Sequence, residues 1–249
     1  MNPFEIPNLF DMQRALFIQP HPDDNDIGAG ATIAKLTASG IEVHYLTVSD
    51  GSSGSDNPKL TPKEIMEMRK LEQIKAGRML GVQHFFWLDY PDGHLFDSEH
   101  LRAKIMEVIR NVNPDIVFTC DPWLPYEAHV DHIVTGKVAT FVALMAGNPH
   151  YYQEQLQQTK PSNIKAIAYY ATHRPNTMIN VDDYWEDKFK AIQAHASQFS
   201  AEYFKWMKSY FTQRALEQAK QANEGCQLVE SFKVLTPMML HYNVDAEDM

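Results

Sequence analysis

Apolar runs and amphipathic segments alternate along the first two-thirds of the chain. Five apolar runs are rich in β-branched and aromatic residues, which is typical of strands buried on both faces of a sheet. They predict strands at residues 15–20, 41–50, 82–90, 115–121 and 165–172. The segments between them carry apolar residues at helical spacing, at 29–40, 61–81, 99–113 and 130–147. Strands that alternate with helices predict a single α/β domain, a Rossmann-like, mostly parallel sheet with helices on both faces.

The predicted helix at 61–81 has the clearest boundary signals. Thr61 is followed by Pro62 and, three residues on, by Glu64. This combination is typical of a capping box with proline in the first helical turn. Gly81 ends the pattern, as expected for a residue just beyond a helix.

The last third of the chain is less regular. Residues 182–198 and 201–223 have helical patterns, and residues 233–244 suggest a late strand. No repeat, low-complexity tract or linker divides the sequence, so we expect one domain over 1–249, with a core at about 14–200 and a C-terminal extension at 201–249. The Gly- and Ser-rich stretch 51–60 follows a predicted strand and is expected to form a mobile loop at the rim of a site.

Composition and charge exclude several classes of partner. The chain carries 22 Lys and Arg residues against 32 Asp and Glu residues, a formal net charge of −10 at pH 7. Such an acidic balance argues against binding nucleic acid or anionic membranes by bulk electrostatics. Cys120 and Cys226 lie far apart in the sequence, so neither a disulfide framework nor a cysteine zinc site is expected. Because no signal peptide or long apolar span is visible, we expect a cytoplasmic protein without a membrane partner.

Polar clusters follow four of the predicted strands. They comprise residues 21–26, the segment after Val48, residues 89–92 and residues 121–132. In an open parallel sheet, ligands bind outside the carboxyl ends of the strands. The order of the elements therefore predicts that these four clusters meet at one edge of the sheet.

The first cluster, in the segment ALFIQPHPDDNDIGAG (15–30), has three interpretations: a turn with solvated acids, a phosphate cradle or a metal site. Gly28 and Gly30 lack a third glycine in register because Ile33 stands there, so the dinucleotide fingerprint fails. No GxxxxGK[ST] motif is present either. We interpret the two glycines as room for close helix–strand packing.

A metal site is favoured when two clusters are considered together. His21 and Asp24 lie three residues apart, and the segment EAHVDH (127–132) supplies His129, Asp131 and His132. Each cluster alone also fits a simpler interpretation, a solvated turn or a helix cap. Two imidazoles and a carboxylate are a common donor set for catalytic Zn²⁺, and other divalent first-row ions suit it as well.

Asp23 is the acid left over beside these donors. On a tight loop, adjacent side chains point in different directions, so Asp24 can bind a metal while Asp23 faces a water molecule. A carboxylate in that position can take the proton of the water. The sequence therefore predicts a hydrolytic metal site.

The motifs PHPDDND and EAHVDH resemble those of the PIG-L/LmbE-like family of zinc-dependent N-deacetylases, which has an AHPDDE-type motif and a later HxDH motif. Further similar segments are 68–82, 88–93 and 187–199, and the resemblance covers about residues 14–200. Within the family, the segments 120–136 and 169–175 are most similar to the diacetylchitobiose deacetylase group.

The resemblance implies roles for individual residues. One Zn²⁺ per chain would be bound by His21, Asp24 and His132. Asp23 would be the general base. The resemblance further implies that His129 would stabilise the tetrahedral intermediate and protonate the leaving amine, and that Asp131 would orient His129. Arg69 and Asp92 would bind sugar hydroxyls.

Two positions stand apart from the family pattern. Tyr126, three residues before His129, is a candidate oxyanion donor that would contact the substrate. Asn25 stands where the common motif has glutamate, so any role of that glutamate in binding a sugar or holding the loop is in question.

The resemblance implies hydrolysis of the N-acetyl group of a small GlcNAc-containing saccharide, of the diacetylchitobiose or N-acetylglucosamine type, with release of acetate during chitin catabolism. Two alternatives stay open: the same chemistry on another N-acyl amino-sugar conjugate, of thiol-sugar or glycolipid type, and a non-catalytic α/β binding protein with a vestigial metal site. The resemblance also implies a homo-oligomer. The aromatic-rich segment 201–211 is either an interface or an ordinary core face.

Overall fold

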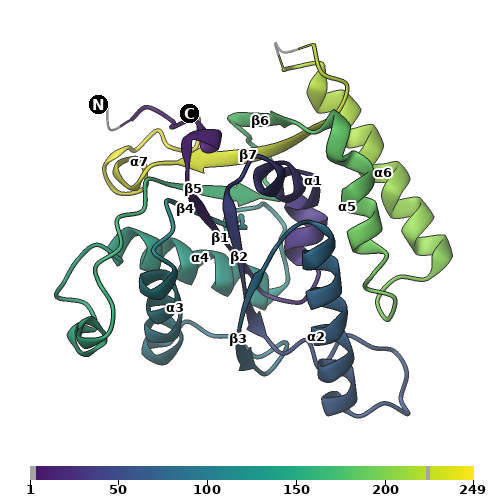
Figure 1. Ribbon diagram of the computed structural model, residues 1–249, viewed down its shortest axis with the longest axis horizontal. Helices are drawn as coiled ribbons and strands as arrows, with labels where there is room; N and C mark the ends of the chain where they lie inside the picture. The colour runs from purple at the N-terminus through teal and green to yellow at the C-terminus, as the bar shows by residue number, and fades with distance from the viewer. Residues whose placement is uncertain (1–3, 223–224) are drawn as a thin grey trace.

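Within the described residues, 4–222 and 225–249, seven strands form one sheet in this computed structural model (Figure 1). The strands are β1 (Arg14–Gln19), β2 (Glu42–Ser49), β3 (His84–Tyr90), β4 (Ile116–Cys120), β5 (Ala166–Tyr170), β6 (Thr177–Asn180) and β7 (Val229–Leu235). Their order across the sheet is β3-β2-β1-β4-β5-β7-β6. The strands β1 to β5 pair in parallel, and β7 is antiparallel to β5 and β6. The predicted, mostly parallel α/β sheet is confirmed.

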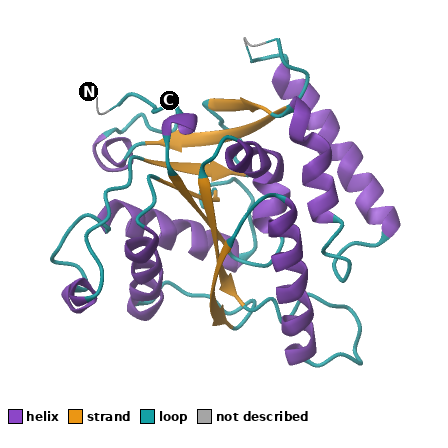
Figure 2. Cartoon of the chain, viewed as in Figure 1, coloured by secondary structure: helices purple, strands orange, loops and turns teal. Residues whose placement is uncertain are grey.

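Helices cover both faces of this sheet (Figure 2). One face packs against α1 (Asp24–Ala38), α2 (Pro62–Met79), α5 (Trp185–Ile192) and α6 (Ala201–Ala219), and the other against α3 (Glu99–Val112), α4 (Val130–Met145) and α7 (Pro237–Tyr242). Short 3₁₀ helices lie at Leu9–Asp11, Gln153–Gln157 and Asp182–Tyr184. None of the helices described is both long and apolar enough to cross a membrane.

Alternating side chains of the central strands form the two halves of the core. Phe17 of β1 and Phe118 of β4 stack on the side of α1, with ring centroids 4.2 Å apart. Leu16 and Val117, their neighbours in the sequence, face α3 and α4. Both faces of these strands are buried, which explains why they read as continuous apolar runs in the sequence.

The boundary signals of α2 are confirmed. The Thr61 hydroxyl oxygen accepts the backbone N–H of Glu64 at 3.3 Å, and the Glu64 carboxylate accepts that of Thr61 at 2.8 Å. Two backbone donors at the start of the helix, which have no partner within the helix, are satisfied in this way.

Predictions for the last third of the chain are partly wrong. The strand placed at 233–244 is β7 at Val229–Leu235, and α7 follows it at Pro237–Tyr242. Thr236 caps α7 and Pro237 occupies its first turn, a helix-start signal that the apolar pattern obscured. The helix predicted at 182–198 is the shorter α5, and β6 was not predicted. The helix predicted at 201–223 corresponds to α6, and residue 223 lies outside the described residues. Residues 1–3, at the start of the region in which no signal peptide is visible, also lie outside them.

The helix α1 starts earlier than predicted and is interrupted near its first turn. It begins at Asp24, and Ala29 departs from helical geometry with φ −146° and ψ 16°. A Cβ atom at Gly28 would overlap the ring of Tyr170, and one at Gly30 would lie 3.0 Å from Cγ of Lys188. The interpretation of the glycines as room for close helix–strand packing is confirmed for Gly28, which faces β5, whereas Gly30 gives room for packing against the helix α5.

Candidate active site

The segments that follow β1 and β4 meet at the carboxyl edge of the sheet. His21 lies two residues beyond β1, and Asp24 is the first residue of α1. His129 is the N-cap residue of α4, and Asp131 and His132 lie in the first turn of that helix. The parallel pairing of β1 with β4 explains why motifs more than 100 residues apart converge.

Three of these residues form a group that can bind a metal ion. His21, Asp24 and His132 each contribute a donor atom within 4.8 Å of the other two. Nδ1 of His21 lies 3.3 Å from one carboxylate oxygen of Asp24, and Nε2 of His132 lies 3.4 Å from the other. Two imidazoles and one carboxylate fit a divalent first-row metal ion, with His132 on the more exposed side.

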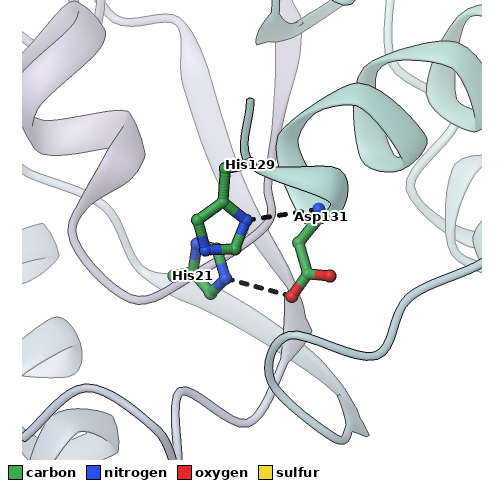
Figure 3. Close-up of side chains that lie close together, drawn as sticks. All are labelled: His21, His129 and Asp131. Carbon is green, nitrogen blue, oxygen red and sulfur yellow. Dashed lines mark hydrogen bonds and ion pairs between the residues drawn. The ribbon is translucent and has the colours of Figure 1, made fainter. Parts of the chain in front are cut away.

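Carboxylates surround the ring of His21, as Figure 3 shows for Asp131. Nε2 of His21 lies 3.2 Å from Asp131 Oδ2 and 3.1 Å from Asp92 Oδ1. Burial by itself would lower the pKa of His21, but hydrogen bonds to Asp131, Asp24 and Asp92 raise the pKa to about 12. The arrangement therefore strongly favours positive charge at this position.

The carboxylate of Asp131 does not bond to the His129 ring that it was predicted to orient. It accepts the backbone N–H groups of Gly93 at 2.7 Å and Leu95 at 3.0 Å, in addition to the contact with His21. The backbone N–H of Asp131 instead donates to Nδ1 of His129 at 3.3 Å (Figure 3). Because Nδ1 accepts this bond, a neutral His129 ring carries its hydrogen on Nε2.

The charge state of His129 follows from its neighbours. Its ring centroid lies 4.6 Å from that of His21 and 5.1 Å from that of His132. Burial and the positive charges of these two histidines lower the pKa of His129. Its ring is therefore neutral at pH 7, with an N–H available on Nε2.

Asp23 has a strained backbone beside the metal donors. It is the N-cap residue of α1 with φ 114°, a conformation that costs a residue other than glycine about 1–3 kcal/mol. Burial raises the pKa of its carboxyl group to about 6, with a further contribution from the Asp24 charge and an opposing one from Arg69. A carboxylate with this pKa is suited to accept a proton near neutral pH.

Gln73 of α2 holds the backbone of Asp23, a contact that the sequence reasoning missed. Its amide oxygen accepts the Asp23 backbone N–H at 2.7 Å and the Gln19 side-chain amide at 2.7 Å. Its amide nitrogen donates to Asp26 at 2.8 Å. Gln73 lies four residues after Arg69, on the same face of α2, and this spacing is the signal that could have identified it.

Asp26 completes the buried network below the site. Its carboxylate lies 2.8 Å from Nε2 of His195 and accepts the hydroxyl of Tyr45 at 2.8 Å. The side chains of Gln19, Gln73, Asp26, Tyr45 and His195 are fully buried.

Arg69 lies under the site and is almost completely buried. Its guanidinium group donates to the carbonyl oxygens of Gly51 at 3.0 Å and Pro22 at 2.8 Å, and lies 3.4 Å from the Asp23 carboxylate. These bonds attach the loop that follows β2 to the loop that follows β1. Its predicted contact with sugar hydroxyls stays a prediction.

Asp92 lies in the cluster, whereas Tyr126 does not. One Asp92 oxygen faces His21, and the other accepts the backbone N–H of Ser53 at 3.1 Å. Tyr126 has a positive φ of 67° and a fully exposed side chain, 102% by relative area. The structure therefore brings Asp92 to the site and leaves Tyr126 on the surface, and their roles toward a substrate stay predictions.

The stretch 51–60 borders the site, as its position after β2 predicted. Ser53 contacts Asp92, and the carbonyl oxygen of Gly54 accepts the side-chain amide of Gln198 at 2.8 Å. Its expected mobility stays a prediction.

Asn25, which departs from the family motif, faces the protein interior. Its side-chain amide donates to the Phe17 carbonyl oxygen at 3.4 Å, and its side-chain oxygen accepts the Tyr170 hydroxyl at 3.2 Å. Its backbone N–H donates to Gln19 at 2.8 Å. A glutamate could accept from Tyr170 but could not donate to Phe17, so the amide suits this buried position.

Comparison with known proteins identifies the family. Residues 16–143 match the family described as PIG-L, GlcNAc-PI de-N-acetylase. The chain belongs to the PIG-L family. It is 36% identical over 240 residues to a diacetylchitobiose deacetylase of Thermococcus kodakarensis, covering 96% of this chain and 89% of that protein.

Two further relatives agree with this assignment. The structure of N,N'-diacetylchitobiose deacetylase from Pyrococcus horikoshii, complexed with its inhibitor MPG, superposes with a TM-score of 0.91 at 34% identity and covers 97% of this chain and 91% of that one. A probable N-acetyl-α-D-glucosaminyl L-malate deacetylase 2 of Bacillus anthracis is 28% identical over 211 residues, covering 80% of this chain and 87% of the relative. The prediction of an amide hydrolase of this family is confirmed, and the two alternatives are not favoured.

Proposed function

We propose that this chain is a zinc-dependent deacetylase that hydrolyses the N-acetyl group of a small GlcNAc-containing saccharide and releases acetate. The observation that carries the proposal is the convergence of the His21, Asp24 and His132 donors beside the strained Asp23 carboxylate. The likeness to diacetylchitobiose deacetylases over nearly the whole chain supports diacetylchitobiose or N-acetylglucosamine as the type of substrate.

His21, Asp24 and His132 would hold the zinc ion, one per chain. When bound, the ion would supply Lewis-acid chemistry, namely polarisation of the acetamide carbonyl and activation of water at neutral pH. Asp92 and Asp131, which face His21, would orient that imidazole through its second nitrogen.

Asp23 would accept the proton of the attacking water. Its carboxylate adjoins the metal donors, and its backbone is held by Gln73 at 2.7 Å. The guanidinium of Arg69, 3.4 Å away, limits rotation of this carboxylate. A general base in a fixed position of this kind contributes on the order of 10²–10⁴-fold to a rate.

His129 would act on the opposite side of the scissile bond. Its Nε2–H is free to donate to the developing oxyanion, because its Nδ1 is engaged by the backbone of Asp131. Protonation of the nitrogen then allows the C–N bond to break, with the amine and acetate as products. Because the neutral His129 ring has only its Nε2 hydrogen, the proton delivered to the nitrogen is the one that Asp23 took from the water.

The substrate type is tested by measuring acetate release from a panel of N-acetylated compounds at equal concentration. We expect the highest kcat/KM with diacetylchitobiose, a lower value with N-acetylglucosamine, and the lowest value with N-acetylglucosaminyl malate. A preference for the malate conjugate would contradict the proposed substrate, and no acetate from any of the three would contradict the proposed function.

Replacing Gln73 with leucine tests how the base is positioned. The substitution removes the acceptor of the Asp23 backbone N–H while leaving every metal donor in place. A displacement of about 1 Å can cost on the order of 10²-fold, so we expect kcat to fall by about that factor with little change in KM or zinc content. Steady-state kinetics and metal analysis check this expectation.

The matched control for Gln73→Leu is Lys75→Leu, at an exposed position of the same helix. It should keep the wild-type kcat. An unchanged kcat in Gln73→Leu would show that the hydrogen bond does not position Asp23.

Three wider expectations belong to the same proposal: a cytoplasmic location, a role in the breakdown of chitin-derived saccharides, and assembly into a homo-oligomer. On α6, Tyr203, Trp206 and Tyr210 are exposed, whereas Phe204 and Phe211 pack against the core. The segment thus combines a core face with an exposed aromatic face.

A further inference from the structure

A second group of metal-binding side chains lies at the opposite end of the sheet from the active site. Glu42 and His84 are the first residues of β2 and β3, and His44 is two residues after Glu42. The strands are parallel, so these residues lie where the strands begin, whereas the active site lies beyond their carboxyl ends. None of these three residues belongs to the groups of metal donors in the active site.

The sheet register places the two histidines side by side. His44 and His84 are directly paired across β2 and β3, and their rings stack with centroids 4.5 Å apart and an interplanar angle of 17°. Glu42 points to the same face as His44 because residues two apart in a strand share a face. Two imidazoles and a carboxylate therefore project together from the sheet.

The donor atoms converge on one oxygen of Glu42. Oε1 lies 3.0 Å from Nε2 of His44 and 3.4 Å from Nε2 of His84. One donor atom from each of the three residues lies within 4.8 Å of the other two. Donors bound to one tetrahedral zinc ion are about 3.3 Å apart, given metal–donor distances of about 2.0–2.1 Å. The exposed ring of His84 can close the remaining difference by rotating about its side-chain bonds.

The surroundings of His44 and Glu42 determine which of their atoms face the cluster. Nδ1 of His44 is buried and has no hydrogen-bond partner among the described residues, whereas Nε2 lies 3.0 Å from Oε1 of Glu42, so Nε2 is the nitrogen that would bind a cation. Arg14 lies 3.6 Å from the other oxygen of Glu42, Oε2, and so orients the carboxylate with Oε1 toward the histidines. Metal-binding carboxylates are commonly fixed by such a partner on the second oxygen.

We propose that Glu42, His44 and His84 form a second site for a divalent first-row cation, of which Zn²⁺ is the type best matched by two imidazoles and one carboxylate. The fourth position, on the exposed side of His84 and Glu42, is open to water. The site is independent of the deacetylase proposal, because none of its residues contacts the active-site group.

The consequence of binding is structural. β3 lies at one edge of the sheet, where it pairs with β2. A cation bound by residues of both strands would link the edge strand to the sheet. Because the unfolded chain lacks this geometry, binding would stabilise the folded protein in proportion to the logarithm of the free cation concentration.

The proposal is tested by equilibrium dialysis of the full chain against Zn²⁺, followed by metal analysis. The variants are His84→Ala and Glu42→Gln, both at exposed positions whose replacement leaves the core intact, with the exposed His150→Ala as the matched control. We expect both site variants to bind one equivalent of zinc fewer than the wild type and His150→Ala. Their rate of acetate release should equal that of the wild type.

A smaller zinc-dependent rise in thermal midpoint in His84→Ala than in the wild type, with the full rise retained in His150→Ala, would support the same conclusion. Equal zinc content in wild type, His84→Ala and Glu42→Gln would overturn it. Failure of the active-site proposal would appear separately, as an unchanged zinc content in His132→Ala.

Discussion

Replacing Asp23 with asparagine is expected to reduce deacetylation by about 10²–10⁴-fold while the protein still binds its metal. Asparagine has nearly the same shape as aspartate and tolerates a positive φ better than most residues, so the backbone at φ 114° is preserved. The backbone N–H that donates to Gln73 is also preserved. The substitution therefore removes the proton acceptor and leaves the metal donors unchanged, which steady-state kinetics combined with metal analysis can verify.

Asp89 offers a matched control for this experiment. It too is an aspartate with positive φ, 52°, but its side chain is exposed and contacts Lys70 at 3.5 Å, and it belongs to none of the groups of metal donors. Asp89→Asn should keep the wild-type rate. If Asp23→Asn retained most of its activity, the assignment of Asp23 as the general base would be wrong.

Replacing His132 with alanine is expected to remove the metal of the active site, one equivalent per chain, and the activity. Two donors, His21 and Asp24, remain in this variant, and such a site binds a divalent ion far more weakly. Lewis-acid stabilisation is worth several kcal/mol, so its loss should reduce the rate by at least about 10³-fold. Emission spectroscopy of the dialysed protein and acetate release measure the two effects.

The side chain of His132 is partly exposed, so the variant is expected to fold. His150→Ala, at another exposed histidine, serves as the control and should retain metal and rate. A His132→Ala protein that still held one equivalent of zinc in the active site would contradict the proposed ligand set.

The metal donors could be predicted from the sequence because they lie in two short motifs at the ends of parallel strands. The order of strands and helices places those ends together before any side chain is considered. His21, Asp24 and His132 do converge, and Asp23 lies beside them. Topology and local spacing bring the two motifs together, and the choice of His21, Asp24 and His132 among their side chains is what the family resemblance implies.

The buried network below the site had no comparable signature. Asp26 and Gln73 come from α1 and α2, His195 lies three residues beyond the end of α5, and the contact between Asp26 and His195 spans 169 positions. Side-chain hydrogen bonds over such separations depend on the packing of α1, α2 and α5, which hydrophobic periodicity does not specify.

Two other differences between the prediction and the structure have local causes. Tyr126 is close to His129 in the sequence, but its positive φ turns the chain, and the ring points into solvent. The segment 233–244 is apolar enough to suggest a strand, yet Thr236 and Pro237 start a helix inside it. In both cases the backbone conformation of one or two residues decides the outcome.

The central claim is that this chain is a deacetylase whose activity depends on a bound metal ion. The most direct measurement is acetate release from diacetylchitobiose by protein as prepared, by protein dialysed against a chelator, and by the dialysed protein after addition of Zn²⁺. We predict that activity is lost on dialysis and restored when the active site is refilled with Zn²⁺. Full activity in metal-free protein would contradict the account.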